Sequence, residues 1–568
     1  MRGLSLIDAV VGSALVLVIF LALIGVMRSS LLIASLAKAK AGATAVADNQ
    51  MEYVRATPYD TVGTVGGIPA GEIPQYATTT QNGIQYGVRT FIEYVDDPAD
   101  GVSGADTNSI TTDYKRIKIA VTYTVRGTLR EVDLVSNYAP ASIETSTNGG
   151  TLKVVIVNAI GSPVPGATVH VVNASTSPAV DLTTFSDASG VVLLGGAATS
   201  TSYQVYVSKS GYSSTQTYPR DTTNQNPTPG YLTVVKNQTT TATFAIDLLA
   251  NLTLKTYTQI TATTTTDSFN DSSKILSQSG TQLSGGSLIL ADAGGGKYVM
   301  TGSVRSISIT PPYLSAWTTA STNLAQPGGT SVIVQVVDST GALIPDGQLP
   351  GNSGGFSGSS INLSGISTST YPSLALRADL TTIDGDNTPS INSWSVNALV
   401  GPTPVSNVSI VLTGAKSIGS TGAGAPIIKT TLATTTGLGG QNTFQMEWDS
   451  YALSLSGYDV VDACYAPSFS LSPATSYTNS LYLGPNSTNS VLITVRDNTG
   501  AYVSGATVTL SRTGFSQSVT TSSCGAAYFG SLTASSAYTV QISKSGYTTT
   551  SNTNVNVTGD IFYATSFP

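Results

Sequence analysis

The chain has 568 residues, of which 10% are charged and 40% are hydrophobic, and its formal net charge is -7. This length is too great for a single hydrophobic core and implies several domains, while the hydrophobic share excludes a chain that is disordered throughout. An acidic chain without a cluster of Lys and Arg is not expected to bind nucleic acid over its bulk surface, because phosphate binding needs such a cluster.

The chain begins with an apolar run from Leu4 to Met27, in which Asp8 is the one charged residue. At a rise of about 1.5 Å per residue, this run forms a helix long enough for the roughly 30 Å core of a bilayer. A secretory signal peptide would carry its cleavage site after the run, but here the small residue Gly3 precedes it and nothing after Met27 resembles such a site. A carboxylate in a membrane helix is costly, so Asp8 is expected to have a partner or a function.

This start resembles the type IV prepilin family, in which a short basic leader ends in Gly and the new N-terminus is apolar, with an acid as its fifth residue. Gly3, Leu4 and Asp8 occupy these positions, although Phe and Glu are more usual than Leu and Asp. The resemblance implies that a prepilin peptidase cleaves after Gly3 and N-methylates Leu4. It also implies that Asp8 pairs with the amino terminus of a neighbouring subunit in a filament core. A plain signal anchor is the alternative.

The helical pattern continues through small residues to about Arg55 and ends at Pro58, which predicts a leader at 1–3 and a helix at 4–57. A small antiparallel head is predicted at 58–142, with alternating residues or turn signals marking strands at Ile84–Val95, 117–125 and Arg130–Asn137. A long helix followed by a small sheet resembles the minor pilins called type IV pilus modification protein V.

An acidic loop lies between the predicted head strands, and its carboxylate and amide oxygens are of the kind that calcium prefers. The candidate ligands are Asp96, Asp97, Asp100, Asp106, Asn108 and Asp113. The spacing is a poor match to an EF-hand loop, and turn-forming Asp and Asn in a solvated loop explain the composition as well. Calcium is therefore one of two interpretations of this loop.

A sequence repeat indicates β modules in the rest of the chain. Gly166-Ala-Thr-Val and, further on, Ser208-Lys-Ser-Gly-Tyr recur as Gly505-Ala-Thr-Val and Ser543-Lys-Ser-Gly-Tyr, and a degenerate copy begins at Val405. These segments resemble the carboxypeptidase regulatory-like and transthyretin-like β-sandwiches, which act as spacer or binding modules. The predicted modules span 148–248, 401–485 and 488–568.

Residues 249–400 do not follow this repeat and loosely resemble a lectin-like jelly roll. If this domain binds a glycan, Trp317 is a candidate for stacking on a sugar ring, and Asp384 and Asp386 are candidates for holding its hydroxyl groups. Core packing is the expected role of Trp394 and Trp448, because each is placed in an alternating strand.

The sequence offers little for catalysis. His170 is the one histidine and lies in an alternating strand pattern, and we find no G-x-S-x-G nucleophile elbow that would display a serine, so we do not expect an enzyme. Cys464 and Cys524 lie in a part expected outside the membrane, where disulfides persist, and are predicted to pair, with free thiols as the alternative.

Together these features predict an α+β chain: a long pilin helix with a small antiparallel-sheet head, then all-β sandwich modules and a jelly-roll-like domain. The predicted function is that of a minor type IV pilin at or near the pilus tip, which presents its β modules for adhesion. Its expected partners are other pilins, prepilin peptidase, the membrane before assembly, and a surface glycan or partner cell. It would begin as a single-pass protein of the cytoplasmic membrane, N-terminus inside, and end on the extracellular pilus. The alternatives are a pseudopilin of a type II secretion system and a membrane-anchored binding protein that never enters a filament.

Overall fold

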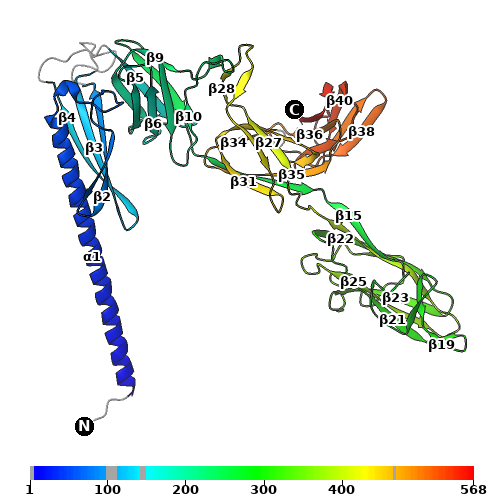
Figure 1. Cartoon of the computed structure of the whole chain (residues 1–568). Helices are drawn as coiled ribbons and strands as arrows, with labels where there is room; N and C mark the ends of the chain where they lie inside the picture. Colours follow the sequence, from blue (N-terminus) through cyan, green and yellow to red (C-terminus); the bar gives the residue numbers. More distant parts are fainter. Residues whose placement is uncertain (1–5, 98–111, 141–148, 465–467) are drawn as a thin grey trace, which may run out of the picture.

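A computed structural model of the chain describes residues 6–97, 112–140, 149–464 and 468–568. It consists of one N-terminal helix followed by β-sheets that pack in pairs as sandwiches. Figure 1 shows the helix running away from the β domains, with two further domains diverging from a central one near the far end of the molecule.

Helix α1 spans Leu6–Ala56 and is followed closely by Pro58. A proline disfavours helical geometry in the residue before it and lacks the N–H that would continue the helix, so α1 ends here. In the second half of α1, buried side chains recur every three or four residues and form one continuous face. These residues are Ala39, Ala43, Val46, Ala47, Met51 and Val54.

The buried face of α1 packs on an antiparallel sheet, which we call the head sheet. After the short 3-10 turn Tyr59–Thr61, its strands are β1 (Tyr76–Gln81), β2 (Ile84–Val95), β3 (Tyr114–Val125) and β4 (Thr128–Tyr138), paired in chain order. The strands expected in this region are present with closely similar bounds. Alternate residues of β2 and β3, such as Val88 and Ile119, face α1 and form the core.

Gly42 marks a close approach of α1 to the head sheet. The Tyr86 hydroxyl donates to the carbonyl oxygen of Ala39 at 3.1 Å, and a Cβ on residue 42 would overlap that hydroxyl. Because Tyr86 is only 1% exposed, its ring has no free space to move into. Gly42 therefore leaves room for this hydrogen bond.

We expect Gly42→Ala to lower the stability of the head by roughly 1–3 kcal/mol, the usual cost of overpacking a core. The sign of the stability change is diagnostic, because a Gly→Ala substitution within a helix otherwise raises stability by about 1 kcal/mol. The measurement is the melting temperature of the full chain in detergent. Gly25→Ala is the matched control, since no atom lies within 4 Å of a Cβ built there. A melting temperature that rises in Gly42→Ala would contradict the close contact.

Among the described residues, one sandwich topology occurs three times, and we call these sandwiches modules 1, 2 and 3. In each, a first strand lies between an antiparallel neighbour and a parallel last strand, and a second sheet covers this one. In module 1, the first sheet is β8 (Val191–Ala197), β5 (Gly150–Val157) and β13 (Thr239–Ala245). The second is β7 (Val180–Phe185), β6 (Thr168–Asn173) and β9 (Ser200–Ser208), to which β10 (Thr215–Gln216) and β12 (Leu232–Val234) are added.

Module 3 repeats this arrangement at the end of the described chain. Its first sheet is β39 (Ala526–Phe529), β36 (Ser490–Arg496) and β42 (Asp560–Ser566), with β36 and β42 parallel. Its second sheet is β38 (Phe515–Thr520), β37 (Thr507–Arg512), β40 (Ser535–Ser543) and β41 (Thr550–Val557).

Module 2 is split in the sequence. Its first strand is β14 (Ala250–Thr258), which pairs with β31 (Gln441–Met446) and, in parallel, with β35 (Ser476–Pro485). The remaining strands are β27 (Ser409–Gly414), β30 (Thr431–Thr435), β32 (Asp449–Leu455) and β34 (Ser468–Leu471) in the second sheet, and β33 (Tyr458–Ala463) beside β35. The boundary predicted at residue 249 is therefore wrong, because β14 belongs to module 2.

An all-β domain, which we call the inserted domain, lies between β14 and the rest of module 2. Its larger sheet contains β15 (Thr261–Asp267), β17 (Thr281–Ser284), β18 (Ser287–Leu290), β22 (Leu314–Ala325), β24 (Ser360–Asn362) and β26 (Ser390–Val400). Its smaller sheet contains β16 (Ile275–Ser279), β21 (Thr301–Ser306), β23 (Thr330–Asp338) and β25 (Leu374–Thr382), and β19 (Asp292–Gly294) and β20 (Lys297–Tyr298) form a hairpin.

The chain enters and leaves the inserted domain side by side. The backbone N–H of Thr258 donates to the carbonyl oxygen of Thr403 at 2.8 Å, and the Thr258 hydroxyl accepts from the N–H of Thr403. Such adjacent connections let a complete domain sit between two strands of another without disturbing their pairing. In Figure 1 this domain extends away from module 2, on the side opposite the label of the C-terminus.

Candidate functional site

The first half of α1 is an apolar surface that no element of the described chain covers. Every residue from Ser13 to Ser30 is exposed, including Phe20 and Leu23 at 60% and 61%. Ser13–Ala56 is long and apolar enough to cross a membrane, and no residue of its most apolar window is buried. Asp8 lies on α1, but its side chain, like the whole of Gly3 and Leu4, is outside the described residues. Cleavage, methylation and pairing at these residues therefore remain predictions.

The head and module 1 meet through hydrogen bonds to backbone carbonyl oxygens, donated by one backbone N–H and by two side chains. The N–H of Asp181 donates to the carbonyl oxygen of Gly66 at 2.8 Å, and the side chain of Gln75 donates to the carbonyl oxygen of Asp181 at 2.7 Å. The guanidinium of Arg89 donates to the carbonyl oxygen of Thr183 and lies 4.4 Å from the ring centre of Phe185. A cleft of about 1110 Å³ lies beside this contact.

The acidic loop is described only at its two ends. Asp113 is buried, and its carboxylate accepts a hydrogen bond from the backbone N–H of Asp97. Asp96 directly precedes Asp97 in the sequence. The candidates Asp100, Asp106 and Asn108 fall outside the described residues. The part of the loop that the structure describes holds no group of three acidic, His or Cys side chains suited to a metal, so calcium binding here stays a prediction.

Modules 1 and 2 are joined by a shared sheet and a charged cluster. Strand β11 (Asn226–Pro227) of module 1 pairs with β28 (Ser417–Ser420) of module 2, which pairs with β29 (Pro426–Ile428). Beside it, the ammonium of Lys429 donates to Glu447 at 2.7 Å and to the carbonyl oxygen of Ser214 at 2.8 Å. Because Glu447 is only 8% exposed, this ion pair within module 2 is shielded from solvent and positions the Lys429 ammonium for its hydrogen bond to module 1.

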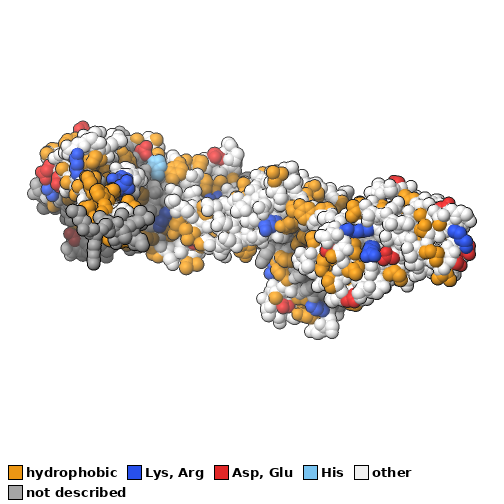
Figure 2. All heavy atoms as spheres, turned by 90° about the horizontal axis from the view of Figure 1, so that it is seen from below, with side chains coloured by type: hydrophobic (Ala, Val, Ile, Leu, Met, Phe, Trp, Pro, Cys, Tyr) orange, Lys and Arg blue, Asp and Glu red, His pale blue; other side chains and the backbone are white. Residues whose placement is uncertain are grey.

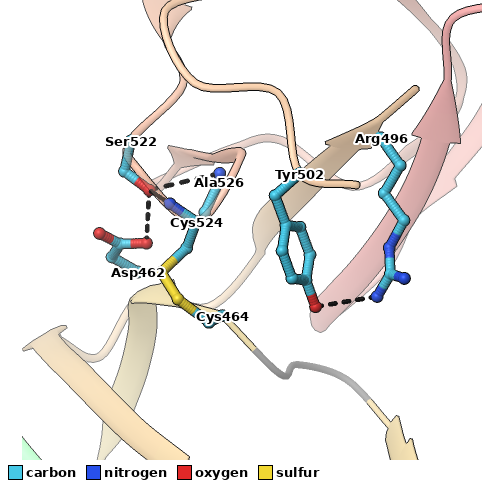
Figure 3. Close-up of a disulfide and its surroundings, with 7 residues drawn as sticks. All are labelled: Asp462, Cys464, Arg496, Tyr502, Ser522, Cys524 and Ala526. Carbon is cyan, nitrogen blue, oxygen red and sulfur yellow. Dashed lines mark hydrogen bonds between the residues drawn. A yellow bond between two sulfur atoms is a disulfide. The ribbon is translucent and has the colours of Figure 1, made fainter. Parts of the chain in front are cut away.

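Modules 2 and 3 form a tighter joint (Figure 3). A disulfide links Cys464, which follows β33, to Cys524, which precedes β39, with 4.5 Å between their Cα atoms. Next to it, the Ser522 hydroxyl donates to Asp462 at 2.8 Å. The hydrophobic core of module 2 also continues into module 3 through Leu492 and Ala526. The two modules are therefore held by covalent, polar and apolar contacts at once.

A buried carboxylate lies in the same joint. Asp459 of β33 accepts hydrogen bonds from the Ser487 hydroxyl at 2.6 Å and from the Tyr528 hydroxyl of β39. Burial and the hydrogen bond to this carboxylate raise the pKa of Tyr528 to about 12. Nothing in the sequence pattern marked this network, because its members come from separate strands of two modules.

One of the glycan-binding candidates in the inserted domain, Trp317, was wrong. Trp317 is 1% exposed, and its indole N–H donates to the carbonyl oxygen of Tyr371 at 2.9 Å, so it packs in the core and cannot stack on a sugar. Asp384 and Asp386 are exposed in the turn between β25 and β26, where Asp386 pairs with Lys297. Sugar contact at these two aspartates stays a prediction.

The other two tryptophans differ from each other. Trp394 is 3% exposed in β26 and packs in the core as expected. Trp448 lies in a bend between β31 and β32 and is half-buried, with the ammonium of Lys416 3.2 Å from the centre of its ring. The prediction that Trp448 lies in a strand was therefore wrong.

His170 is accounted for by surface contacts. Its Nε2 lies 2.7 Å from a carboxylate oxygen of Asp181, and its ring centre lies 5.7 Å from that of Tyr206.

Figure 2 shows the β domains seen from below: most of their visible surface consists of uncharged polar side chains and backbone, with scattered acidic and basic groups. Such a surface offers many hydrogen-bonding groups and produces little net electrostatic field.

Comparisons with known proteins assign one part of the chain. Residues 490–562, which lie within module 3, match the carboxypeptidase regulatory-like domain. No curated protein sequence matches the chain.

Several solved structures show weak similarity. One is the TIE protein of Bacillus anthracis, with 11% identity, 87% of this chain and 73% of that chain covered, and a TM-score of 0.15. Another is the shaft pilin SpaA of Lactobacillus rhamnosus GG, with 14% identity, 29% and 89% covered, and a TM-score of 0.11. A third is BcpA, the major pilin subunit of Bacillus cereus, with 10% identity, 74% and 99% covered, and a TM-score of 0.13. Such low identities and TM-scores carry no argument about function.

Proposed function

We propose that this chain is a membrane-inserted, pilin-like surface subunit, in which α1 is the anchor and the β domains form a projecting arm. The observation that carries the proposal is the division of α1: its second half is buried against the head sheet, while its first half is apolar and exposed on every side. Leaving this much apolar surface in water is unfavourable by about 25 cal/mol per Å². We therefore expect the first half of α1 to be surrounded by lipid or by the helices of other subunits.

More specifically, we propose a minor type IV pilin located at or near the tip of the filament. The N-terminal sequence with Gly3, Leu4 and Asp8 supports processing by a prepilin peptidase and docking through Asp8. The head sheet on α1 supports a pilin-like head. An arm of this size would collide with its copies in a tightly packed helical filament, which favours the tip. The arm, including a jelly-roll-like inserted domain, is non-catalytic and presents adhesive surfaces.

The second candidate is a membrane-anchored binding protein that never enters a filament. It is favoured by the same exposure of α1 on all sides, because lipid alone would cover this surface. The two candidates differ in one respect: only the filament role needs a partner for Asp8. A pseudopilin of a secretion system shares the docking step and differs in what the arm contacts.

Asp8→Ala tests the docking step. We expect the variant to insert into the membrane but to fall by at least about tenfold in sheared surface filaments, because removing one member of a buried ion pair leaves the other charge unpaired at a cost of about 3 kcal/mol or more. Asp48→Ala is the control, since Asp48 is exposed on the same helix. The measurement is the amount of chain in the filament fraction, with mass spectrometry of its N-terminus.

In this experiment the wild-type chain should begin with N-methylated Leu4. Two results would reject the filament role: a wild-type chain that keeps Met1 to Gly3, or an Asp8→Ala chain that enters filaments at the wild-type level. The first of these would leave the anchored binding protein as the function.

A further inference from the structure

The joint between modules 2 and 3 contains a carboxylate whose charge is not balanced by the groups around it. Asp459 is 1% exposed. Its Oδ2 accepts hydrogen bonds from the Ser487 N–H at 3.1 Å, from the Ser487 hydroxyl at 2.6 Å, and from the Tyr528 hydroxyl. Three donors on one oxygen fix the orientation of the carboxylate, and none of them carries a positive charge.

The other oxygen of Asp459, Oδ1, is buried and accepts no hydrogen bond from any residue that the structure describes. Within the same described ranges, no ion pair involves Asp459. A buried ionised group without a counter-charge is strongly unfavourable, and buried polar atoms in native proteins nearly always have a partner. The Oδ1 atom is therefore where a missing partner belongs.

A second carboxylate reaches the same place from module 3. Asp560, at the start of β42, is exposed at the rim and accepts a hydrogen bond from the Ser490 hydroxyl at 2.9 Å. Asp459 accepts a hydrogen bond from Ser487, and Asp560 accepts one from Ser490, which also pairs with Asp560 in the sheet. The short linker 487–490 therefore brings one carboxylate from each module to the same place.

We propose that the pair Asp459 and Asp560 binds a divalent cation of the calcium class at the joint between modules 2 and 3. Calcium takes oxygen ligands from carboxylates, hydroxyls, carbonyls and water, and the linker from Ser487 to Ser490 carries hydroxyl and carbonyl oxygens beside both aspartates. The cation would supply the counter-charge that Oδ1 lacks. Because its two acidic ligands belong to different modules, it would brace the joint from a position separate from the disulfide.

Two carboxylates, one of them at the rim, predict weak binding. Sites with few charged ligands in extracellular modules bind calcium with dissociation constants of roughly 10⁻⁴ to 10⁻³ M. The inference stands on the joint alone and does not depend on the proposed filament role.

The test uses the full-length chain in detergent and calcium or terbium ions as probes. In the wild-type chain, we expect calcium to raise the melting temperature in a saturable way, and bound terbium to show luminescence sensitised by Tyr528 and displaced by calcium. Asp560→Asn should weaken calcium binding at least about tenfold while still folding, because Asp560 lies at the rim. Tyr528→Phe should lose most of the luminescence.

Asp462→Asn is the matched control, because Asp462 lies on the same strand β33 and its carboxylate accepts from Ser522 instead. It should bind calcium like the wild type. Any calcium bound by the acidic loop of the head is common to all variants and cancels in the comparison. The proposal is overturned if calcium affects wild type and Asp560→Asn equally. It is also overturned if calcium has no effect on the melting temperature of the wild-type chain.

Discussion

Replacing Cys524 with serine is expected to lower the free energy of unfolding of the unit formed by modules 2 and 3 by about 4 kcal/mol. The disulfide joins residues 60 positions apart. In the chain-entropy model, removing a cross-link that closes a loop of this size returns about 4 kcal/mol of conformational freedom to the unfolded chain. The folded state also loses a covalent tie across the joint, so module 3 should unfold at a lower temperature than module 2.

The measurement is calorimetric unfolding of the full chain in detergent without reductant. The wild type should show one transition for modules 2 and 3, because they share a core, whereas Cys524→Ser should show two. The double variant Cys464→Ser/Cys524→Ser should equal the single variant, since both remove the same bond. Ser523→Ala is the control at an exposed neighbouring position. Equal stability of wild type and Cys524→Ser would show that the noncovalent contacts alone hold the joint.

The parts of the fold that the sequence predicted well are those encoded by local pattern. The end of α1 follows from Pro58, and the strands of the head follow from alternation over about ten residues. Modules 1 and 3 were recognisable because both carry a Gly-Ala-Thr-Val segment and a Ser-Lys-Ser-Gly-Tyr segment at similar spacing. Each of these signals lies within one element or one module.

The split of module 2 was missed because its evidence is not local. Strand β14 pairs with β35, more than two hundred residues later, and the inserted domain separates β14 from every other strand of its module. A signal was nevertheless present: the Thr-Leu-Lys of Thr253 to Lys255 in β14 repeats the Thr-Leu-Lys of Thr151 to Lys153 in β5. Both are first strands of a module, so this short match could have placed β14 correctly.

The candidate sites were harder to predict than the fold. Strand β22 has a bulge between Trp317 and Thr319, which shifts its alternation, so the side on which Trp317 lies cannot be counted from the sequence. The cluster around Asp459 needs β33, β39 and β42 to meet, and no spacing in the sequence records that meeting. Sites built from several strands of two modules become visible only when those modules are placed together.

Raising the pH from about 8 to about 9.5 is expected to stabilise the head by about 2 kcal/mol, because Lys115 is buried there. Lys115 lies on β3 and is 1% exposed. Its ammonium donates to the carbonyl oxygens of Tyr59 at 2.6 Å and Val62 at 2.7 Å. Burial lowers the pKa of Lys115 to about 8, and the charge of Asp60 opposes this shift only in part.

The direction follows from proton binding in the two states. Below the folded pKa of about 8, the amine is protonated whether the head is folded or not. Between that value and the ordinary value of 10.5, the unfolded chain binds one proton more than the folded chain, so stability rises with pH. The range should stop short of pH 10, because burial raises the pKa of Tyr94, whose ring centre lies 5.3 Å from the Lys115 ammonium, and that shift lowers stability as free tyrosines ionise.

Lys115→Met should remove this pH dependence, since methionine fills a similar volume and does not titrate. The measurement is the melting temperature of the head transition in the full chain, compared between about pH 8 and about pH 9.5. Lys118→Met is the matched control, because Lys118 lies on the opposite face of β3 and pairs with Asp133 at 2.6 Å with 44% of its side chain exposed. If Lys115→Met and wild type respond to pH alike, the amine is solvated in the folded head and the buried position assigned to it is wrong.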